Sequence, residues 1–314
     1  MRCQTGDNGM IGPNSDLEKG FRHMPVQPMN LDDFDGELNQ LAMSESARPF
    51  LEKVRTFIAE EVEPMSIEFH KLDDKKPDPW QYAPGQLELL EETKSKAKAN
   101  GLWNFFLPDS EVGGLTNLDY AYIATELGKN RLASESLNCS APDTGNMEVL
   151  ERVGTPEQKK QWLEPLLNGE IRSAFAMTEL HHASSDAKNV ATSAVRDGDE
   201  YVVTGAKVWT TKAPYCDVCL LLVRTTPKEE CDGPTQGMTL LLVDLQDPAV
   251  DITPIPKLGR NAVVSCEVRY DGLRVPVSRR VGEEGEGFRY ILDGLNPERI
   301  LIASEALGIG RAAL

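Results

Sequence analysis

The hydrophobic period of this chain changes twice, and the changes divide it into three regions. From Ala47 to about Gly169, apolar residues recur every three or four positions, which is the spacing of amphipathic helices. From Ile171, short β-prone runs are separated by turn residues. Helical spacing returns near Gly287 and continues to Leu314. The sequence therefore predicts an α+β fold with a helical region, a β-region and a further helix.

Several segments of the first region have the pattern of single helices. Thr155 begins one of them as an N-cap, with proline at the first helical position and Gln158 at the capping-box position. Gly169 can end this helix. The other predicted helices cover residues 47–62, 87–102 and 118–127.

The second region has the pattern of short strands. Two β-prone runs, 192–196 and 201–204, flank the turn residues Asp197 to Glu200, which is a hairpin signal. Further strands are predicted at 218–223, 238–243, 250–255 and 265–270. Short strands at this spacing predict a small antiparallel β-barrel or sandwich.

The last region is one long apolar-rich helical segment from Phe288 to Leu314, with Pro297 inside it. The pattern reaches Leu314 without a stop signal, so we expect only the start of a C-terminal helical bundle, truncated after its first helix. The predicted domains are a mobile N-terminal tail (1–45), a helical domain (46–170), a β-domain (171–284) and this first helix (285–314).

The charge of the chain excludes some classes of partner and compartment. A net charge of −17 at pH 7 repels phosphate backbones, so nucleic acid is not an expected partner. No apolar run has transmembrane length. The N-terminal tail lacks the apolar core of a secretory signal and is too acidic for a good transit peptide.

Cys216 and Cys219 have the spacing of a zinc motif, but no second pair follows and no histidine lies nearby. Their place in a strand pattern favours buried free cysteines, which fit a reducing compartment. We predict a cytoplasmic protein, with the mitochondrion as the alternative. His181 and His182 are also not expected to bind metal, because adjacent loop residues point to different sides.

Four ordered motifs resemble those of the flavin-dependent acyl-CoA dehydrogenases. They are Phe175-Ala-Met-Thr-Glu179, Gly205-Ala-Lys-Val-Trp-Thr-Thr211, Val268-Arg-Tyr-Asp-Gly-Leu-Arg-Val-Pro276 and Gly285-Glu-Gly-Phe288, and the resemblance extends over about 47–314. It implies FAD-dependent α,β-desaturation of an acyl-CoA thioester. It also implies an electron acceptor such as an electron-transfer flavoprotein and, for a full-length chain, a homodimer or homotetramer.

The resemblance assigns site residues one by one. It places Phe175, Ala176, Met177 and Thr178 along the flavin ring, Trp209 against its face, Thr210 and Thr211 beside it, and Ser185 near the FAD pyrophosphate. It assigns Ser184 and Arg299 to substrate binding. Taken alone, a tryptophan or a strand threonine is more often an ordinary core or strand residue.

The base that removes the substrate α-proton is the least determined of these assignments. Some branches of the family place it directly before the arginine of the first C-terminal helix, which here is Glu298, and others place it in a loop beyond Leu314. Glu298 also fits a solvated helix glutamate. Glu305 is a lesser candidate, and Glu179 matches a structural glutamate of the family.

Two alternatives to a dehydrogenase remain open at this stage. The chain could be an inactive fragment of the family that acts by binding or not at all, because most of a C-terminal helical domain is missing from the pattern. It could also be an oxidase that passes electrons to oxygen. Acyl chain length does not follow from the sequence.

Overall fold

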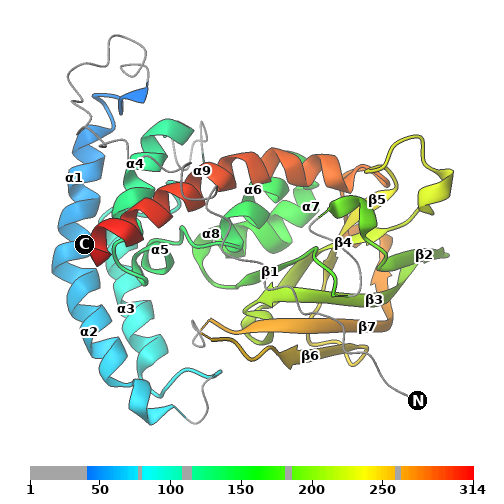
Figure 1. The fold of residues 1–314 in the computed structure, drawn as a ribbon, viewed down its shortest axis with the longest axis horizontal. Helices are drawn as coiled ribbons and strands as arrows, with labels where there is room; N and C mark the ends of the chain where they lie inside the picture. The colour runs from blue at the N-terminus through cyan, green and yellow to red at the C-terminus, as the bar shows by residue number, and fades with distance from the viewer. Residues whose placement is uncertain (1–40, 77–79, 108–114, 181–185, 259–262) are drawn as a thin grey trace, which may run out of the picture. The chain divides into compact units, whose positions relative to one another are not determined.

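The structure is a computed structural model, and it describes residues 41–76, 80–107, 115–180, 186–258 and 263–314 (Figure 1). Leu41 and Ala42 belong to an N-terminal unit of their own. Residues 43–314 form a second unit, which contains all the helices and strands named here. The order of helices, strands and a final helix confirms the predicted α+β class.

The predicted helix at 47–62 is part of a longer one. Helix α1 (Arg48–Phe57) continues through a π-helical turn (Ile58–Val62) into α2 (Glu63–Lys71). Its apolar face, including Val54 and Val62, is buried against the other helices. These are α3 (Gln86–Ala99), α4 (Asn117–Leu127), α5 (Ala133–Ser136) and α6 (Asp143–Val153).

The predicted capping box at Thr155 is confirmed, because the Thr155 hydroxyl accepts from the Gln158 N–H and the Gln158 side chain accepts from the Thr155 N–H. Helix α7 (Pro156–Gln158) leads through a π-helical turn (Lys159–Leu163) into α8 (Glu164–Asn168). Gly169 ends α8 in the left-handed region at φ 68°, as predicted.

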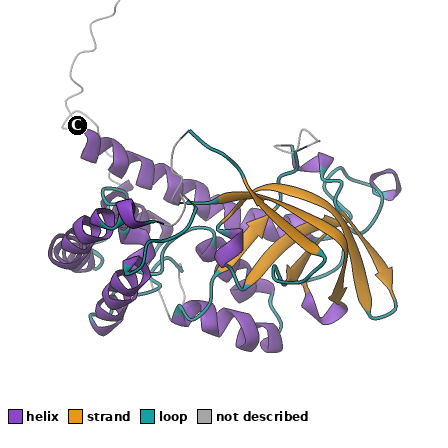
Figure 2. Ribbon diagram, turned by 90° about the horizontal axis from the view of Figure 1, so that it is seen from below, coloured by secondary structure: helices purple, strands orange, loops and turns teal. Residues whose placement is uncertain are grey.

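The β-region is one mixed sheet, shown in orange in Figure 2, with the order β6-β7-β3-β2-β4-β5-β8 and β1 paired to β4. Most neighbours are antiparallel, as predicted, but β1 and β2 both pair with β4 in parallel. The strands are β1 (Ser173–Ala176), β2 (Ser193–Asp197), β3 (Glu200–Thr211), β4 (Val218–Arg224), β5 (Met238–Val243), β6 (Val250–Pro254), β7 (Ser265–Pro276) and β8 (Arg280–Val281).

Side chains on opposite faces of the sheet enter two different cores. On β1, Ala174 and Ala176 are buried in the core of the β-region, whereas Phe175 packs against the core shared with the helices. Leu221 and Leu220 on β4 divide in the same way. This period-two alternation turns Phe175 and Leu220 toward the helices.

Helix α9 (Gly287–Ala313) packs against α4, α6 and β5 (Figure 1). Pro297 lies inside this helix. It approaches α4 very closely, since a Cβ atom on Gly308 would lie 2.1 Å from the carbonyl oxygen of Thr125. A Cβ atom on Gly128 would lie 2.1 Å from the carbonyl oxygen of Glu305. Both positions therefore require glycine.

Cys216 and Cys219 are buried free cysteines, which confirms that interpretation of their spacing. Within the described ranges, no group of three or more histidine, cysteine, aspartate or glutamate residues is placed to hold a metal ion. No helix in the described part of the chain is long and apolar enough to cross a membrane.

Candidate active site

An apolar cavity of about 80 Å³ lies where the helical region, the sheet and α9 meet. Phe175 of β1 and Leu220 of β4 contribute its sheet side, and Glu298 of α9 is the only acidic residue among its described lining residues. Phe175 and Glu298 were both predicted as site residues, and the structure places both of them at this cavity. The remaining lining residues are Pro142, Gly145, Asn146, Val149, Ile291, Gly294 and Leu295.

The carboxyl group of Glu298 is removed from most solvent contact at this cavity. Burial raises its pKa from 4.5 to about 7, and the charge of Glu305 acts in the same direction, while Thr144 lowers it. A carboxyl group with this pKa can be ionised at neutral pH and still accept a proton readily. The arrangement differs from a solvated helix glutamate paired with lysine or arginine.

Gly145 lies directly beside the Glu298 carboxylate. A Cβ atom at Gly145 would stand 3.3 Å from Oε2 of Glu298, which is a tight contact, whereas one at Gly294 would meet only ordinary contacts at 3.5 and 3.6 Å. Both glycines line the same cavity. The two positions therefore form a matched pair for testing how accurately the carboxylate must be placed.

The resemblance to the acyl-CoA dehydrogenases implies acyl-CoA-dependent flavin reduction, and we expect Gly145→Ala to slow that reaction by about tenfold, since small displacements of a reacting group cost much of its rate. Gly294→Ala should keep most of the rate. Stopped-flow absorbance of the flavin measures both, and circular dichroism checks that both variants fold. Equal losses in the two variants would contradict the role of Gly145 in placing Glu298.

A second part of the predicted site lies where the end of β1 meets β3. The Val208 N–H donates to the carbonyl of Thr178 (2.8 Å). The next residue, Trp209, has φ 64° and lies at a register shift in the β3–β7 pairing. The residue is 54% exposed, an unusual state for a tryptophan in a strand. Such a bulge re-aims a side chain and is typical of binding sites.

The residues around Trp209 differ in their exposure. Met177 and Thr178 are half-buried and lie just beyond the end of β1, so the strand is shorter than the predicted flavin strand. Ala176 is buried. Thr211 is half-buried, while Thr210 is completely buried and its hydroxyl has no hydrogen-bond partner in the described part of the protein.

Of the other residues predicted to bind cofactor or substrate, the structure describes only Arg299, which is not brought to this site. Ser184 and Ser185, like His181 and His182, lie outside the described residues. Arg299 is exposed on α9, where it donates to Oδ1 of Asn296, and it lines neither this cavity nor the smaller one described below.

Glu179 has the structural role that was predicted for it. Its carboxylate accepts from the N–H groups of Ala191 (2.8 Å) and Thr192 (2.9 Å) and pairs with buried Lys207 (2.8 Å). Burial lowers the pKa of Lys207 to about 8, and the charge of Glu179 opposes this shift. These bonds connect the segment that follows β1 with Lys207 on β3. A carboxylate with these partners is not free to act as a base.

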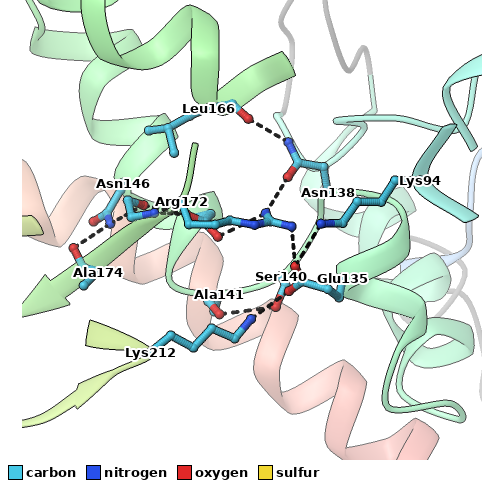
Figure 3. A network of polar contacts seen from close by, with 12 residues as sticks. Lys94, Glu135, Asn138, Ser140, Ala141, Asn146, Leu166, Arg172, Ala174 and Lys212 are labelled. Carbon is cyan, nitrogen blue, oxygen red and sulfur yellow. Dashed lines mark hydrogen bonds and ion pairs between the residues drawn. The ribbon is translucent and has the colours of Figure 1, made fainter. Parts of the chain in front are cut away.

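A polar network that sequence patterns did not reveal lies beside the cavity (Figure 3). At its centre, the Glu135 carboxylate pairs with Arg172, with Lys212 (2.7 Å) and with Lys94 (3.5 Å). The cavity residue Asn146 donates to the Ser173 hydroxyl (2.9 Å) and, as Figure 3 shows, to the carbonyl of Ala174 (3.0 Å). The network thus connects α3, α5, α6 and Lys212, which directly follows β3, around the start of β1.

Comparison with known proteins identifies the family. The model of the acyl-CoA dehydrogenase N-terminal domain matches residues 44–170, and that of the middle domain matches residues 174–273. The probable acyl-CoA dehydrogenase FadE2 of Mycobacterium tuberculosis is 46% identical over 231 residues, covering 72% of this chain and 56% of FadE2. Acyl-CoA dehydrogenase family member 11 of Gallus gallus is 40% identical over 280 residues, covering 86% of this chain and 35% of that protein.

A solved structure of a Mycobacterium abscessus protein, described as an acyl-CoA dehydrogenase, superposes with a TM-score of 0.78. It is 37% identical, and the match covers 87% of this chain and 69% of that one. The chain belongs to the acyl-CoA dehydrogenase family, whose members are flavoproteins. It spans about half of FadE2 (56%) and about a third of family member 11 (35%).

Proposed function

We propose that this chain takes part in FAD-dependent α,β-desaturation of an acyl-CoA thioester, with Glu298 as the base that removes the α-proton. The observation that carries the proposal is the position of Glu298. It lies on the wall of an apolar cavity where α6, β1 and α9 meet, and burial holds its pKa near 7.

The cavity supplies what the reaction requires of the protein. The α C–H bond of a thioester is a weak acid, so its base must be close to the substrate and shielded from water. Leu220, Leu295 and Phe175 give an apolar wall against which an acyl chain can bind. Glu298 lies on the same wall, where its carboxylate can contact a bound acyl-CoA.

The surface around Trp209 fits a flavin. A flavin needs a flat apolar wall for its ring and hydrogen-bonding groups for its polar edge. The exposed Trp209 indole offers the first, and the half-buried hydroxyls of Thr178 and Thr211 offer the second. When bound, FAD supplies the acceptor for the hydride that leaves the substrate. Phe175, Ala176, Met177, Thr210 and Ser185 remain proposed members of this site.

We expect Thr178→Val and Trp209→Leu to lower the FAD content of the purified chain several-fold, since each removes a contact proposed for the flavin. Thr204→Val is the matched control, because Thr204 lies exposed on β3 at a separate register shift, away from the bulge at Trp209. Flavin absorbance per protein after incubation with FAD and gel filtration gives the measurement. Equal FAD content in all variants would contradict the placement of the cofactor.

The proposed partners are acyl-CoA and an electron acceptor such as an electron-transfer flavoprotein, within a homodimer or homotetramer. The test is to add acyl-CoA to the FAD-loaded chain and follow bleaching of the flavin. Peroxide formed under air would assign an oxidase instead. A chain that binds FAD but is not reduced by any acyl-CoA would overturn the proposal. The cytoplasmic location stays a prediction.

A further inference from the structure

A second, smaller cavity lies on the helical side of Glu298. It measures about 10 Å³, which is about the space that one water molecule needs. Among its described lining residues, three ionisable side chains come from three helices: Tyr120 from α4, Glu148 from α6 and Glu298 from α9. The rest of its lining is Phe106, Asn117, Ala121, Pro297, Ile300 and Leu301.

One of these groups is buried without a hydrogen-bond partner. Glu148 and Tyr120 are each only 5% exposed. Oε2 of Glu148 forms no hydrogen bond with any described residue, whereas the Tyr120 hydroxyl interacts with the Cys139 thiol. Leaving a buried polar group unsatisfied costs about 1–3 kcal/mol. Both Glu148 and Tyr120 line the cavity that Glu298 also lines.

We propose that Glu148 is a positioning residue for Glu298, and that the two carboxyl groups share one proton across this one-water cavity. When Glu298 is ionised, Glu148 keeps its proton, so the pair carries one negative charge and not two. The neutral Glu148 side chain then lines the cavity without repelling the ionised carboxylate of Glu298. The inference rests on the proposed function of Glu298.

The surrounding charges agree with this division of the proton. Burial raises the pKa of Glu148 to about 7, Arg152 on α6 lowers it, and the charge of Glu298 raises it further. From α9, Glu305 raises the pKa of Glu298. Burial keeps the Tyr120 hydroxyl, which lines the cavity, and the Cys139 thiol beside it protonated well above neutral pH. Two coupled carboxyl groups therefore titrate near neutrality.

The test is a carbon-13 NMR titration of the chain labelled at the glutamate side-chain carboxyl carbon, without flavin or acyl-CoA. The carboxyl groups of surface glutamates have pKa values of about 4.3. We expect two further resonances with midpoints near neutral pH. Glu148→Gln removes one of them. Glu298→Gln removes the other and lowers the midpoint of Glu148 by about one pH unit, because it removes the neighbouring charge.

Glu151→Gln is the matched control, since Glu151 lies exposed on the same helix and pairs with Lys159. This variant should keep both neutral midpoints. If Glu148→Gln does not fold, Glu298→Gln is sufficient for the test, because the titration midpoint of Glu148 is measured directly in that variant. A Glu148 midpoint near 4, or one that Glu298→Gln leaves unchanged, overturns the inference. If the titration shows the coupled pair but the Glu298→Gln variant still desaturates acyl-CoA, the proposed function is overturned. The inference that the two carboxyl groups share a proton then still holds.

Discussion

Glu298→Gln should reduce acyl-CoA-dependent flavin reduction by about a thousand-fold, within the range of about 10² to 10⁴ attributed to general acid–base groups. Glutamine nearly matches the size of glutamate but cannot accept the proton. Stopped-flow reduction of the FAD-loaded chain measures the rate. In the unsubstituted chain the rate should rise with pH through about 7, the pKa of Glu298.

The same variant should also change stability, which gives a second readout. The folded pKa of Glu298, about 7, lies above its ordinary 4.5, so the folded state binds more protons than the unfolded state between these values. Stability from this group is complete below pH 4.5 and is lost as the pH rises to 7. Glu298→Gln should therefore be more stable than the unsubstituted chain at pH 8, by about 3 kcal/mol at most, and equal at low pH.

Two outcomes would contradict the assignment of the base. In the first, Glu298→Gln keeps its rate while Glu305→Gln loses it, which would move the base to the next candidate on α9. In the second, the two chains have the same stability at pH 8, which would place the Glu298 carboxyl in solvent. Flavin content measured alongside separates loss of chemistry from loss of the cofactor.

The fold was largely predictable because its elements bury apolar faces at regular spacing. The period of three and four in α1 and the strand runs in β4 and β5 identify those elements directly. The parallel pairings of β1 and β2 with β4 were not predicted, because they join segments far apart in the chain. The bulge at Trp209 was not predicted for the same reason, since it arises from the register with β7.

The site was only partly predictable because α6 buries polar residues. Asp143, Asn146 and Glu148 are all buried on this helix, although such residues ordinarily mark a solvent face. Periodicity therefore assigns Glu148 to the surface. The signal that could indicate these buried polar residues is a shortage of apolar ones. A helix that packs between apolar neighbours, with few apolar residues of its own, must bury polar groups. The assignment of Glu298 followed from the family resemblance alone.

The largest stability effect should come from Glu135, the centre of the network in Figure 3. Its side chain is 12% exposed and pairs with Arg172, Lys212 and Lys94. These cations hold the pKa of Glu135 well below its ordinary 4.5, against the effect of burial. Glu135→Gln would leave three largely buried cations with too little negative charge. We expect a loss of about 3–5 kcal/mol, measured by urea unfolding at pH 7.

Glu91→Gln is the matched control, because Glu91 pairs with the same Lys94 (2.7 Å) but is 59% exposed. It should cost about 1 kcal/mol or less. Since the pKa of Glu135 is lowered in the folded state, its contribution is present above pH 4.5 and is lost as the pH falls further. The gap between Glu135→Gln and the unsubstituted chain should therefore narrow in acid. Equal losses in both variants at pH 7 would show that the network does not stabilise the junction between β1 and the helices.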